Sequence, residues 1–405
     1  MSKVVIIGAG HAGGSVAGFL RQYGFDGQII LAGTESLAPY QRPPLSKAWL
    51  KGEADESSLQ LRAGDFYAEN RIDLRLNVTA LAIDRDHRTV TFDDGTVETF
   101  DHLVIATGSR ARKLPVPGGD DPGLLELRTT ADAERLKSAL GAGRRLVVVG
   151  GGYVGLEAAA SARALGSEAT VLERMDRVLQ RVASSTLSAF YTRRHRQEEV
   201  DIRTGVEITS VTAQSVTLDD GSVLEADAIL VGIGAIANDE LARRAGLDCQ
   251  DGILVDLEAR TSDASILAIG DVTRRPLPYY SGQLHRLESV PNALEQAKQA
   301  AAAITGRPNP APEVPWFWSE QYDAKLQIAG LPFGADAQVI RGDPDTGSFA
   351  VFHLNGNKIA CVEAVNAGQA FMFAKQAIAR DLPIDAGRLA DPSCPIKDAA
   401  VTSAA

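Results

Sequence analysis

The chain has 405 residues, of which 45% are hydrophobic and 23% charged, and its formal net charge is −11. This length predicts about two to three domains, and no apolar run reaches the roughly 20 residues of a membrane span. The acidic balance argues against nucleic-acid binding through a generally basic surface, and the N-terminus lacks the apolar region of a secretory signal, so we expect a cytoplasmic protein.

The chain has three cysteines, Cys249, Cys361 and Cys394, and they lie far apart in the sequence. None forms a C-x-x-C pair, and none has histidine companions at metal-ligand spacing. We therefore expect free thiols in a reducing compartment, no structural disulfide and no metal site.

The N-terminal segment predicts a strand, a glycine turn and a helix. An apolar run over residues 4–7 enters a G-x-G-x-x-G turn at Gly8, Gly10 and Gly13, and the following helix has apolar residues at helical spacing. The next apolar run, residues 28–32, ends near Glu35, whose carboxylate suits ribose hydroxyls. This combination strongly favours a dinucleotide-binding site, because the glycines allow a pyrophosphate to approach the helix N-terminus.

The same pattern returns in the middle of the chain. A strand over residues 146–149 leads into Gly150, Gly152 and Gly155, and a second strand ends at Glu173. The chain thus contains two candidate dinucleotide sites.

A longer internal repeat supports duplication of this unit. Residues 89–108 align without gaps on residues 215–234, and each segment has alternating strands around an Asp-Gly turn, then a buried strand ending in glycine. Two unrelated hairpins would explain the pattern less well, because the similarity is in register. We expect a parallel sheet with an attached antiparallel meander in each half.

Residues 114–119 indicate a linker into the second nucleotide domain. Residues 240–315 contain a third pattern that indicates a ligand site. A buried strand ends in Gly270-Asp271, where open α/β sheets bind ligands, although Gly-Asp alone also fits a solvated turn. A helix is predicted from Val290 to Ala303, with proline in its first turn and its positive end near that ligand.

The C-terminal part is predicted to form a separate unit from Pro315. It opens with Trp316-Phe317-Trp318 and contains two strand runs, residues 335–340 and 349–353. A basic stretch, residues 193–196, lies in the second nucleotide domain, where we expect a solvated helix face.

Seven segments together resemble a known family along essentially the whole chain. They read GAGHAG, RPPLSKAWL, ATGSR, GGGYVGLE, SILAIGDV, ESVPNALEQA and PWFWSEQYDAKLQIAG. The sequence is similar to the FAD-dependent pyridine nucleotide reductases of the glutathione-reductase-like fold, in the putidaredoxin reductase and rhodocoxin reductase group. Within that group it resembles the palustrisredoxin-reductase type.

The resemblance implies an α/β fold with two Rossmann-type domains and a C-terminal α+β domain. The implied FAD domain is discontinuous, over residues 1–113 and 240–315. The NAD domain covers residues 114–239, and the C-terminal reductase domain covers residues 316–405.

The resemblance also implies tightly but non-covalently bound FAD at the first glycine turn and NADH at the second. The implied cofactor contacts are Gly8, Gly10, Gly13, Glu35, Arg42, Lys47, Val78, Ala106, Arg128, Gly150, Gly152, Gly155, Glu157, Glu173, Gly234, Asp271 and Val290. Glu173 favours NADH over NADPH, because its charge repels a 2′-phosphate; Arg174 and Arg181 are the counter-argument.

The catalytic residues implied by the resemblance are Lys47, Glu157 and Trp318. Lys47 and Glu157 match residues near the flavin and the nicotinamide, and we expect them to form an ion pair across the reacting rings with an electrostatic role. Without the family resemblance, the better interpretation of Lys47 would be a solvated helix residue, and that of Glu157 an ordinary acidic residue in the second turn of a helix.

The segment of residues 42–47 contains no cysteine, whereas disulfide reductases and peroxide or NADH oxidases carry a redox cysteine there. Reduction of disulfides or of peroxide through a cysteine is therefore unsupported. With FAD alone, we expect two electrons to enter as hydride and to leave singly.

The family makes the acceptor a small acidic [2Fe-2S] ferredoxin that supplies a bacterial cytochrome P-450 monooxygenase, in a ferredoxin–NAD(+) reductase reaction. Trp318 matches an aromatic near the docking surface, and Arg307 and Lys325 are the expected cationic neighbours. The alternatives are an NADH-sensing flavoprotein of apoptosis-inducing-factor type and the reductase component of a Rieske dioxygenase.

Overall fold

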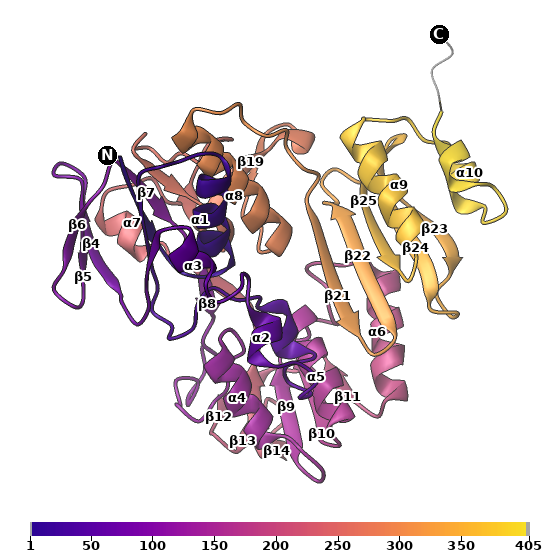
Figure 1. Ribbon diagram of the computed structural model, residues 1–405. Coiled ribbons are helices and arrows are strands. Elements are labelled where there is room, and N and C mark those ends of the chain that lie inside the picture. The colour runs from indigo at the N-terminus through magenta and orange to yellow at the C-terminus, as the bar shows by residue number, and fades with distance from the viewer. Residues whose placement is uncertain (1, 402–405) are drawn as a thin grey trace. The chain divides into compact units, whose positions relative to one another are not determined.

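The computed structural model describes residues 2–401, which form two compact units (Figure 1). Unit 1 comprises residues 2–42, Glu56–Arg110 and Ile236–Glu313, and unit 2 comprises Pro43–Asp55, Ala111–Ala235 and residues 314–401. The division into three domains expected from the sequence stays a prediction. In the described part of the chain, no helix has the length and apolar character needed to cross a membrane.

Unit 1 is built on a parallel sheet of five strands in the order β18-β7-β1-β2-β3. The strands are short apolar runs because both faces of the sheet are covered. They are β1 (Lys3–Ile7), β2 (Gln28–Ala32), β3 (Ile72–Arg75), β7 (His102–Ile105) and β18 (Ile266–Ala268).

Helices α1 (His11–Gln22) and α8 (Val290–Thr305) lie side by side on this sheet (Figure 1). Small residues make the close approach possible: Ala297, Ala300 and Ala301 of α8 are buried in one core with Val16 and Leu20 of α1. This packing positions the N-terminus of each helix at the carboxyl end of the strands, where ligands bind in such sheets.

The predicted repeat is confirmed by two matching three-stranded meanders. The first contains β4 (Ala80–Asp84), β5 (Thr89–Phe92) and β6 (Val97–Thr99), and the second contains β12 (Ile208–Val211), β13 (Ser215–Leu218) and β14 (Val223–Glu225). Gly95 and Gly221 occupy the same place in their turns, with φ of +83° and +84°. Only glycine adopts this conformation without strain, which explains the repeated Asp-Gly pair.

The remaining elements of unit 1 are short. They are α2 (Glu56–Leu59), α3 (Phe66–Glu69), α7 (Glu240–Arg244), β17 (Ile253–Leu254), β19 (Thr273–Leu277), β20 (Gln283–His285) and the 3-10 helices η2 (Gly270–Val272) and η3 (Pro278–Tyr280). The chain passes between the units at β8 (Ser109–Ala111) and β16 (Ala235–Ala237).

Unit 2 contains a second parallel sheet, in the order β11-β10-β9-β15. Its strands are β9 (Arg145–Val149), β10 (Glu168–Glu173), β11 (Asp201–Thr204) and β15 (Ala228–Val231). Helices α4 (Thr130–Ala139), α5 (Tyr153–Ala164) and α6 (Ser185–Gln197) accompany it, and η1 (Pro43–Ser46) packs against α4 and α5.

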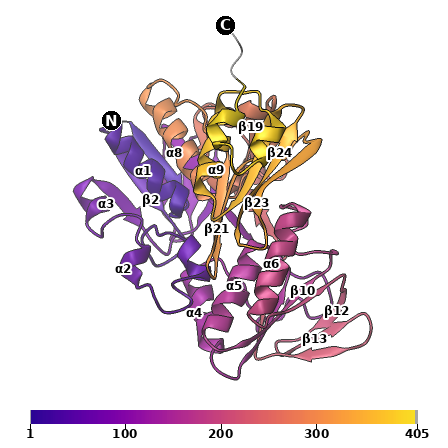
Figure 2. The same ribbon diagram turned by 90° about the vertical axis from the view of Figure 1, so that its right-hand side faces the viewer.

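The C-terminal part of unit 2 is an antiparallel sheet of five strands with helix α9 (Gly368–Ala379) packed on β22 and β25 (Figure 1). The strands, in sheet order, are β21 (Trp316–Gln321), β22 (Ala324–Gly330), β25 (Lys358–Val365), β24 (Ser348–Asn355) and β23 (Ala337–Asp343); α10 (Ala386–Ala390) and η4 (Ile396–Ala399) follow. Figure 2 shows the same part from the side, with α9 beside β21, β23 and β24. The expected α+β class is confirmed. The two predicted strand runs correspond to β23 and β24, and β21, β22 and β25 are three further strands that were not predicted.

Candidate functional site

The turn between β1 and α1 has the shape of a phosphate site. Gly8 has φ +110°, and a Cβ there would lie 2.2 Å from the carbonyl oxygen of Ala106; a Cβ on Gly13 would lie 1.9 Å from that of Gly8. At Gly10 the nearest heavy atom to a Cβ would be Nη2 of Arg42, at 3.8 Å. The N-terminus of α1 is therefore open beside a guanidinium, which fits the pyrophosphate of FAD.

The acid after β2 is already held by side chains of unit 1. Tyr40 Oη donates to Glu35 Oε2 at 2.6 Å, and Arg42 Nη2 donates to Glu35 Oε1 at 2.6 Å. Burial opposes the charge of Arg42, but Tyr40 and Glu35 outweigh it and raise the pKa of Arg42. Tyr40 lies buried two residues before Arg42 and orients this pair, and no motif in the sequence pointed to it.

Helix α8 is hydrogen-bonded to η2, the short segment that contains Asp271. Gln296 of α8 accepts hydrogen bonds through Oε1 from the Gly270 amide at 2.8 Å and from Thr273 Oγ1 at 2.9 Å, so it ties η2 to the helix. Ser289 caps the start of α8 by accepting from the Asn292 amide. Gln296 thus holds α8 against the segment that contains Asp271, and the roles of Asp271 and Val290 at the flavin stay predictions.

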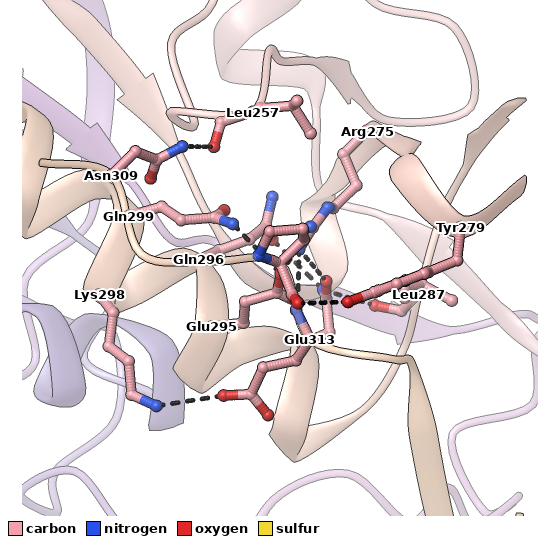
Figure 3. A network of polar contacts seen from close by, with 12 residues as sticks. Leu257, Arg275, Tyr279, Leu287, Glu295, Gln296, Lys298, Gln299, Asn309 and Glu313 are labelled. Atoms are coloured by element: carbon pink, nitrogen blue, oxygen red, sulfur yellow. Dashed lines mark hydrogen bonds and ion pairs between the residues drawn. The ribbon is translucent and has the colours of Figure 1, made fainter. Parts of the chain in front are cut away.

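A buried ion pair also fixes α8, and Asn292 connects it to Gln296. The sequence carried no recognisable signal for this pair. Arg275 of β19 donates to both carboxylate oxygens of Glu295, each at 3.0 Å, and to Asn292 Oδ1 at 3.2 Å (Figure 3). Gln299 Nε2 and the Glu313 amide also donate to Glu295, at 3.2 and 3.1 Å. Helix α8, β19 and the end of unit 1 are joined through this carboxylate.

The second glycine turn repeats the geometry of the first. Gly150 has φ +107°, and a Cβ there would lie 2.5 Å from the Gly232 carbonyl oxygen; a Cβ on Gly155 would lie 2.4 Å from that of Gly150. A Cβ on Gly152 would have no neighbour within 4 Å. The middle glycine again leaves a helix N-terminus open, here that of α5, and the turn fits the pyrophosphate of NAD(H).

Glu173, at the end of β10, is held in place before any ligand arrives. Its Oε2 accepts from the Gly151 amide at 2.8 Å, and its Oε1 accepts from the Met175 amide at 2.9 Å. Arg174 and Arg181 are exposed, and Arg181 Nη2 lies 3.8 Å from the Cβ position of Gly234. The fixed negative charge at this turn is unfavourable for a 2′-phosphate.

The expected ion pair between Lys47 and Glu157 is present in unit 2. Lys47 Nζ donates to Glu157 Oε2 at 2.6 Å, and the two side chains are 17% and 4% exposed. Ser46 also donates to Oε2, and Ser319 donates to Oε1 at 2.6 Å. The position of this pair at the reacting rings stays a prediction.

The aromatic residues of β21 form a half-buried cluster with α9. The rings of Trp316 and Trp318 lie 5.5 Å apart, Phe371 lies 5.8 Å from Trp316, and Lys375 Nζ lies 5.2 Å from the Trp316 ring centre. Such an assembly presents both aromatic surface and positive charge.

The expected docking residues do not form one cluster within either unit. Lys325 is exposed on β22 of unit 2, but Arg307 belongs to unit 1, where it donates to the Tyr23 carbonyl oxygen at 3.0 Å and covers its ring. The docking roles of Trp318, Lys325 and Arg307 stay predictions.

The expectation of a solvated helix face over residues 193–196 is wrong for His195. This residue has no exposed surface, because α6 turns it toward β21, while Arg193 and Arg194 pair with Asp345 and Asp323. The remaining expected contacts lie at element ends. Val78 donates its amide to the Gly33 carbonyl, Ala106 follows β7, Arg128 precedes α4, and Gly234 has φ +113°.

Among residues 2–401, no cluster of three or more histidine, cysteine or acidic residues is arranged to hold a metal ion, and the three cysteines are free thiols. Cys361 is buried, and burial raises the pKa of its thiol.

Two protein families match this chain. Residues 2–297 match the pyridine nucleotide-disulphide oxidoreductases, and residues 316–400 match the reductase C-terminal domain. A probable ferredoxin reductase of Castellaniella defragrans is 48% identical over 404 residues, which cover 98% of this chain and 99% of the relative.

Two solved structures of reductases are also similar to this chain along nearly its whole length. The putidaredoxin reductase of a covalent putidaredoxin reductase–putidaredoxin complex is 42% identical, with a TM-score of 0.95 and coverage of 98% of this chain and 97% of that one. The ferredoxin reductase for the CYP199A2 system from Rhodopseudomonas palustris is 40% identical, with a TM-score of 0.94 and coverage of 99% and 100%.

The fold and the two glycine turns thus define an FAD-dependent oxidoreductase that uses NAD(H). The chain belongs to the pyridine nucleotide-disulphide oxidoreductase family and, within it, to the ferredoxin–NAD(+) reductases of the putidaredoxin reductase and rhodocoxin reductase group.

Proposed function

We propose that this protein transfers electrons from NADH through FAD, one at a time, to a small acidic [2Fe-2S] ferredoxin that supplies a bacterial cytochrome P-450 monooxygenase in the cytoplasm. The similarity to the reductase of the CYP199A2 system supports the monooxygenase pathway.

The proposal rests on the contacts between Glu157 and the segment that follows Arg42. It supplies the Ser46 hydroxyl and the Lys47 ammonium, and no thiol. A disulfide or sulfenate relay therefore has no sulfur at this position, and the reaction depends on FAD, which accepts a hydride and releases single electrons when bound.

The residues of the chain supply binding and electrostatics. Arg42 and the α1 N-terminus suit the FAD pyrophosphate. The amides at the start of α8 favour the negative charge that the flavin develops on reduction. Glu173 selects NADH, since its carboxylate is already held by two amides and would repel a 2′-phosphate. The Lys47–Glu157 pair orients the nicotinamide.

The decisive experiment is steady-state reduction of a panel of [2Fe-2S] ferredoxins, drawn from P-450 and from Rieske dioxygenase systems, by the purified flavoprotein. NADH and NADPH serve as donors, and dichlorophenolindophenol serves as an acceptor that needs no docking. We expect reduction of a P-450-type ferredoxin, with NADH preferred.

Faster reduction of a dioxygenase ferredoxin would instead identify the protein as the reductase component of a Rieske dioxygenase. Dye reduction without reduction of any ferredoxin, together with a change in molecular size when NADH is added, would favour the NADH-sensing alternative. Rapid NADH-dependent consumption of peroxide would contradict the argument from the missing cysteine.

A further inference from the structure

A continuous series of hydrogen-bonded side chains in unit 2 runs from the half-buried Tyr322 through buried polar residues to Glu157. Tyr322 Oη lies 3.1 Å from His195 Nδ1, and His195 Nε2 lies 2.8 Å from Gln321 Oε1. Gln321 Nε2 donates to Ser319 Oγ at 3.1 Å, and Ser319 Oγ donates to Glu157 Oε1 at 2.6 Å.

Three secondary-structure elements contribute side chains to this hydrogen-bonded series. His195 comes from α6, Glu157 comes from α5, and Ser319 and Gln321 come from β21, where a spacing of two residues places both side chains on the same face. The sheet of the C-terminal part is thereby connected to the helix that begins at the second glycine turn.

The burial of these groups requires an explanation. His195 and Ser319 have no exposed surface, and Gln321 is 1% exposed. Buried polar groups destabilise a fold unless hydrogen bonds compensate them, and apolar residues fill such space without that requirement. Desolvation lowers the pKa of His195 to about 4, so its imidazole is neutral at physiological pH.

The direction of every hydrogen bond follows from Glu157. As the partner of the Lys47 ammonium, the carboxylate of Glu157 only accepts hydrogen bonds. Ser319 must therefore donate its single hydroxyl proton to Glu157, and its oxygen accepts from the amide group of Gln321.

The directions of the other two hydrogen bonds, between Gln321, His195 and Tyr322, follow from that of Ser319. With its amide nitrogen turned to Ser319, Gln321 presents its oxygen to His195, which must donate from Nε2. A neutral imidazole has one N–H group, so Nδ1 accepts from Tyr322. All four hydrogen bonds thus run toward Glu157, an arrangement in which each bond polarises the next.

We propose that Ser319, Gln321 and His195 are positioning residues that hold the Glu157 carboxylate in the orientation needed for hydride transfer. Ser319 anchors Oε1, which leaves Oε2 facing Lys47 and Ser46; Gln321 and His195 keep the Ser319 hydroxyl pointing at Glu157. The inference rests on the proposed function, in which the Lys47–Glu157 pair lies beside the nicotinamide.

The kinetic test is anaerobic stopped-flow reduction of the bound flavin by NADH, a step that involves no ferredoxin. We expect Ser319→Ala to lower the limiting rate about tenfold, the effect of losing a hydrogen bond to a charged group, while the apparent Kd for NADH changes less than twofold. His195→Leu should lower the rate by roughly threefold to tenfold, since it acts through two other residues.

Two further variants separate positioning from a purely structural role. His195→Gln retains a donor at the place of Nε2 and should recover most of the rate lost in His195→Leu. Thr192→Val, also on α6, removes a hydroxyl that bonds only to the Ser188 carbonyl oxygen, and it should leave the rate unchanged.

Nitrogen-15 NMR of histidine-labelled protein supplies a readout that is independent of activity. The chain has six histidines, and the resonances lost in His195→Gln identify His195. We expect the Nε2–H tautomer at neutral pH, and an Nδ1–H tautomer would overturn the directed chain.

Limiting rates within twofold of the wild type in both Ser319→Ala and His195→Leu would overturn the positioning role, even if both variants unfold at lower temperature. A wild-type flavin that NADH leaves oxidised would instead overturn the proposed function, and the inference with it.

Discussion

The Arg275 guanidinium and the Glu295 carboxylate meet in two parallel hydrogen bonds, each 3.0 Å long, in the interior of unit 1 (Figure 3). The two residues are 2% and 5% exposed, and amide groups of Asn292, Gln299 and Glu313 complete the network around them. Because α8 begins at the expected flavin site, this pair links the stability of unit 1 to the position of that site.

Arg275→Met should lower the free energy of unfolding by about 3–5 kcal/mol, because it leaves the Glu295 charge buried without its partner. Urea unfolding measures the loss. Arg274→Met is the matched control, since the half-buried Arg274 reaches only the Gln250 carbonyl oxygen, at 3.3 Å. The double variant Arg275→Met/Glu295→Leu should recover much of the loss; a double variant less stable than Arg275→Met would contradict the explanation.

Glu173→Gln should reduce the preference for NADH over NADPH about tenfold, because removing a single charge beside a 2′-phosphate is worth about 1.4 kcal/mol. The ratio of kcat/KM for the two donors measures the preference. Asp176→Asn removes an exposed charge three residues further on and serves as the control. An unchanged ratio in Glu173→Gln would mean that another residue, such as Arg181, determines donor choice.

Lys47→Met should slow flavin reduction by NADH roughly tenfold to a hundredfold, since hydrogen bonds between charged groups are among the strongest in proteins. Stopped-flow absorbance follows the reaction. Lys51→Met is the control, because Lys51 pairs with the exposed Glu53 in the same segment. Equal rates in the two variants would show that the Lys47–Glu157 pair is structural only.

The buried imidazole of His195 predicts a specific dependence of stability on pH. Its pKa is about 4 in the folded protein against 6.5 as the ordinary value, so between these values the unfolded chain binds more protons. Stability is therefore complete above pH 6.5 and falls as the pH drops toward 4, by about 3 kcal/mol for this residue.

Urea unfolding of the wild type and of His195→Gln at pH 7.5 and 4.5 tests this expectation. The wild type should lose more stability than the variant over this interval, because glutamine does not titrate. Equal losses of stability in the two proteins would mean that the pKa of His195 is that of a solvated histidine, which would contradict its burial.

The sequence by itself determined the features that depend on neighbouring residues. The two glycine turns are local, since the positive φ of Gly8 and Gly150 and the close approach of Gly13 and Gly155 follow from residues within one strand-turn-helix unit. The duplicated meander was equally readable, because an Asp-Gly turn and alternating strands are specified over a few residues. Resemblance along the whole chain then supplied the class of enzyme.

Only the tertiary structure decided that Ser319, Gln321 and His195 join Glu157. The pairing of Lys47 with Glu157 across 110 positions was expected from the family resemblance, but nothing in the sequence indicated the bond to Ser319 across 162 positions. No periodic pattern encodes which hydroxyl faces which carboxylate. His195 was misjudged for the same reason. Its arginine neighbours indicated a solvated face, yet the helix turns one residue of that stretch inward, where packing against β21 removes it from water. Local sequence specifies turns and periodicity, whereas pairing inside the core depends on which elements pack together.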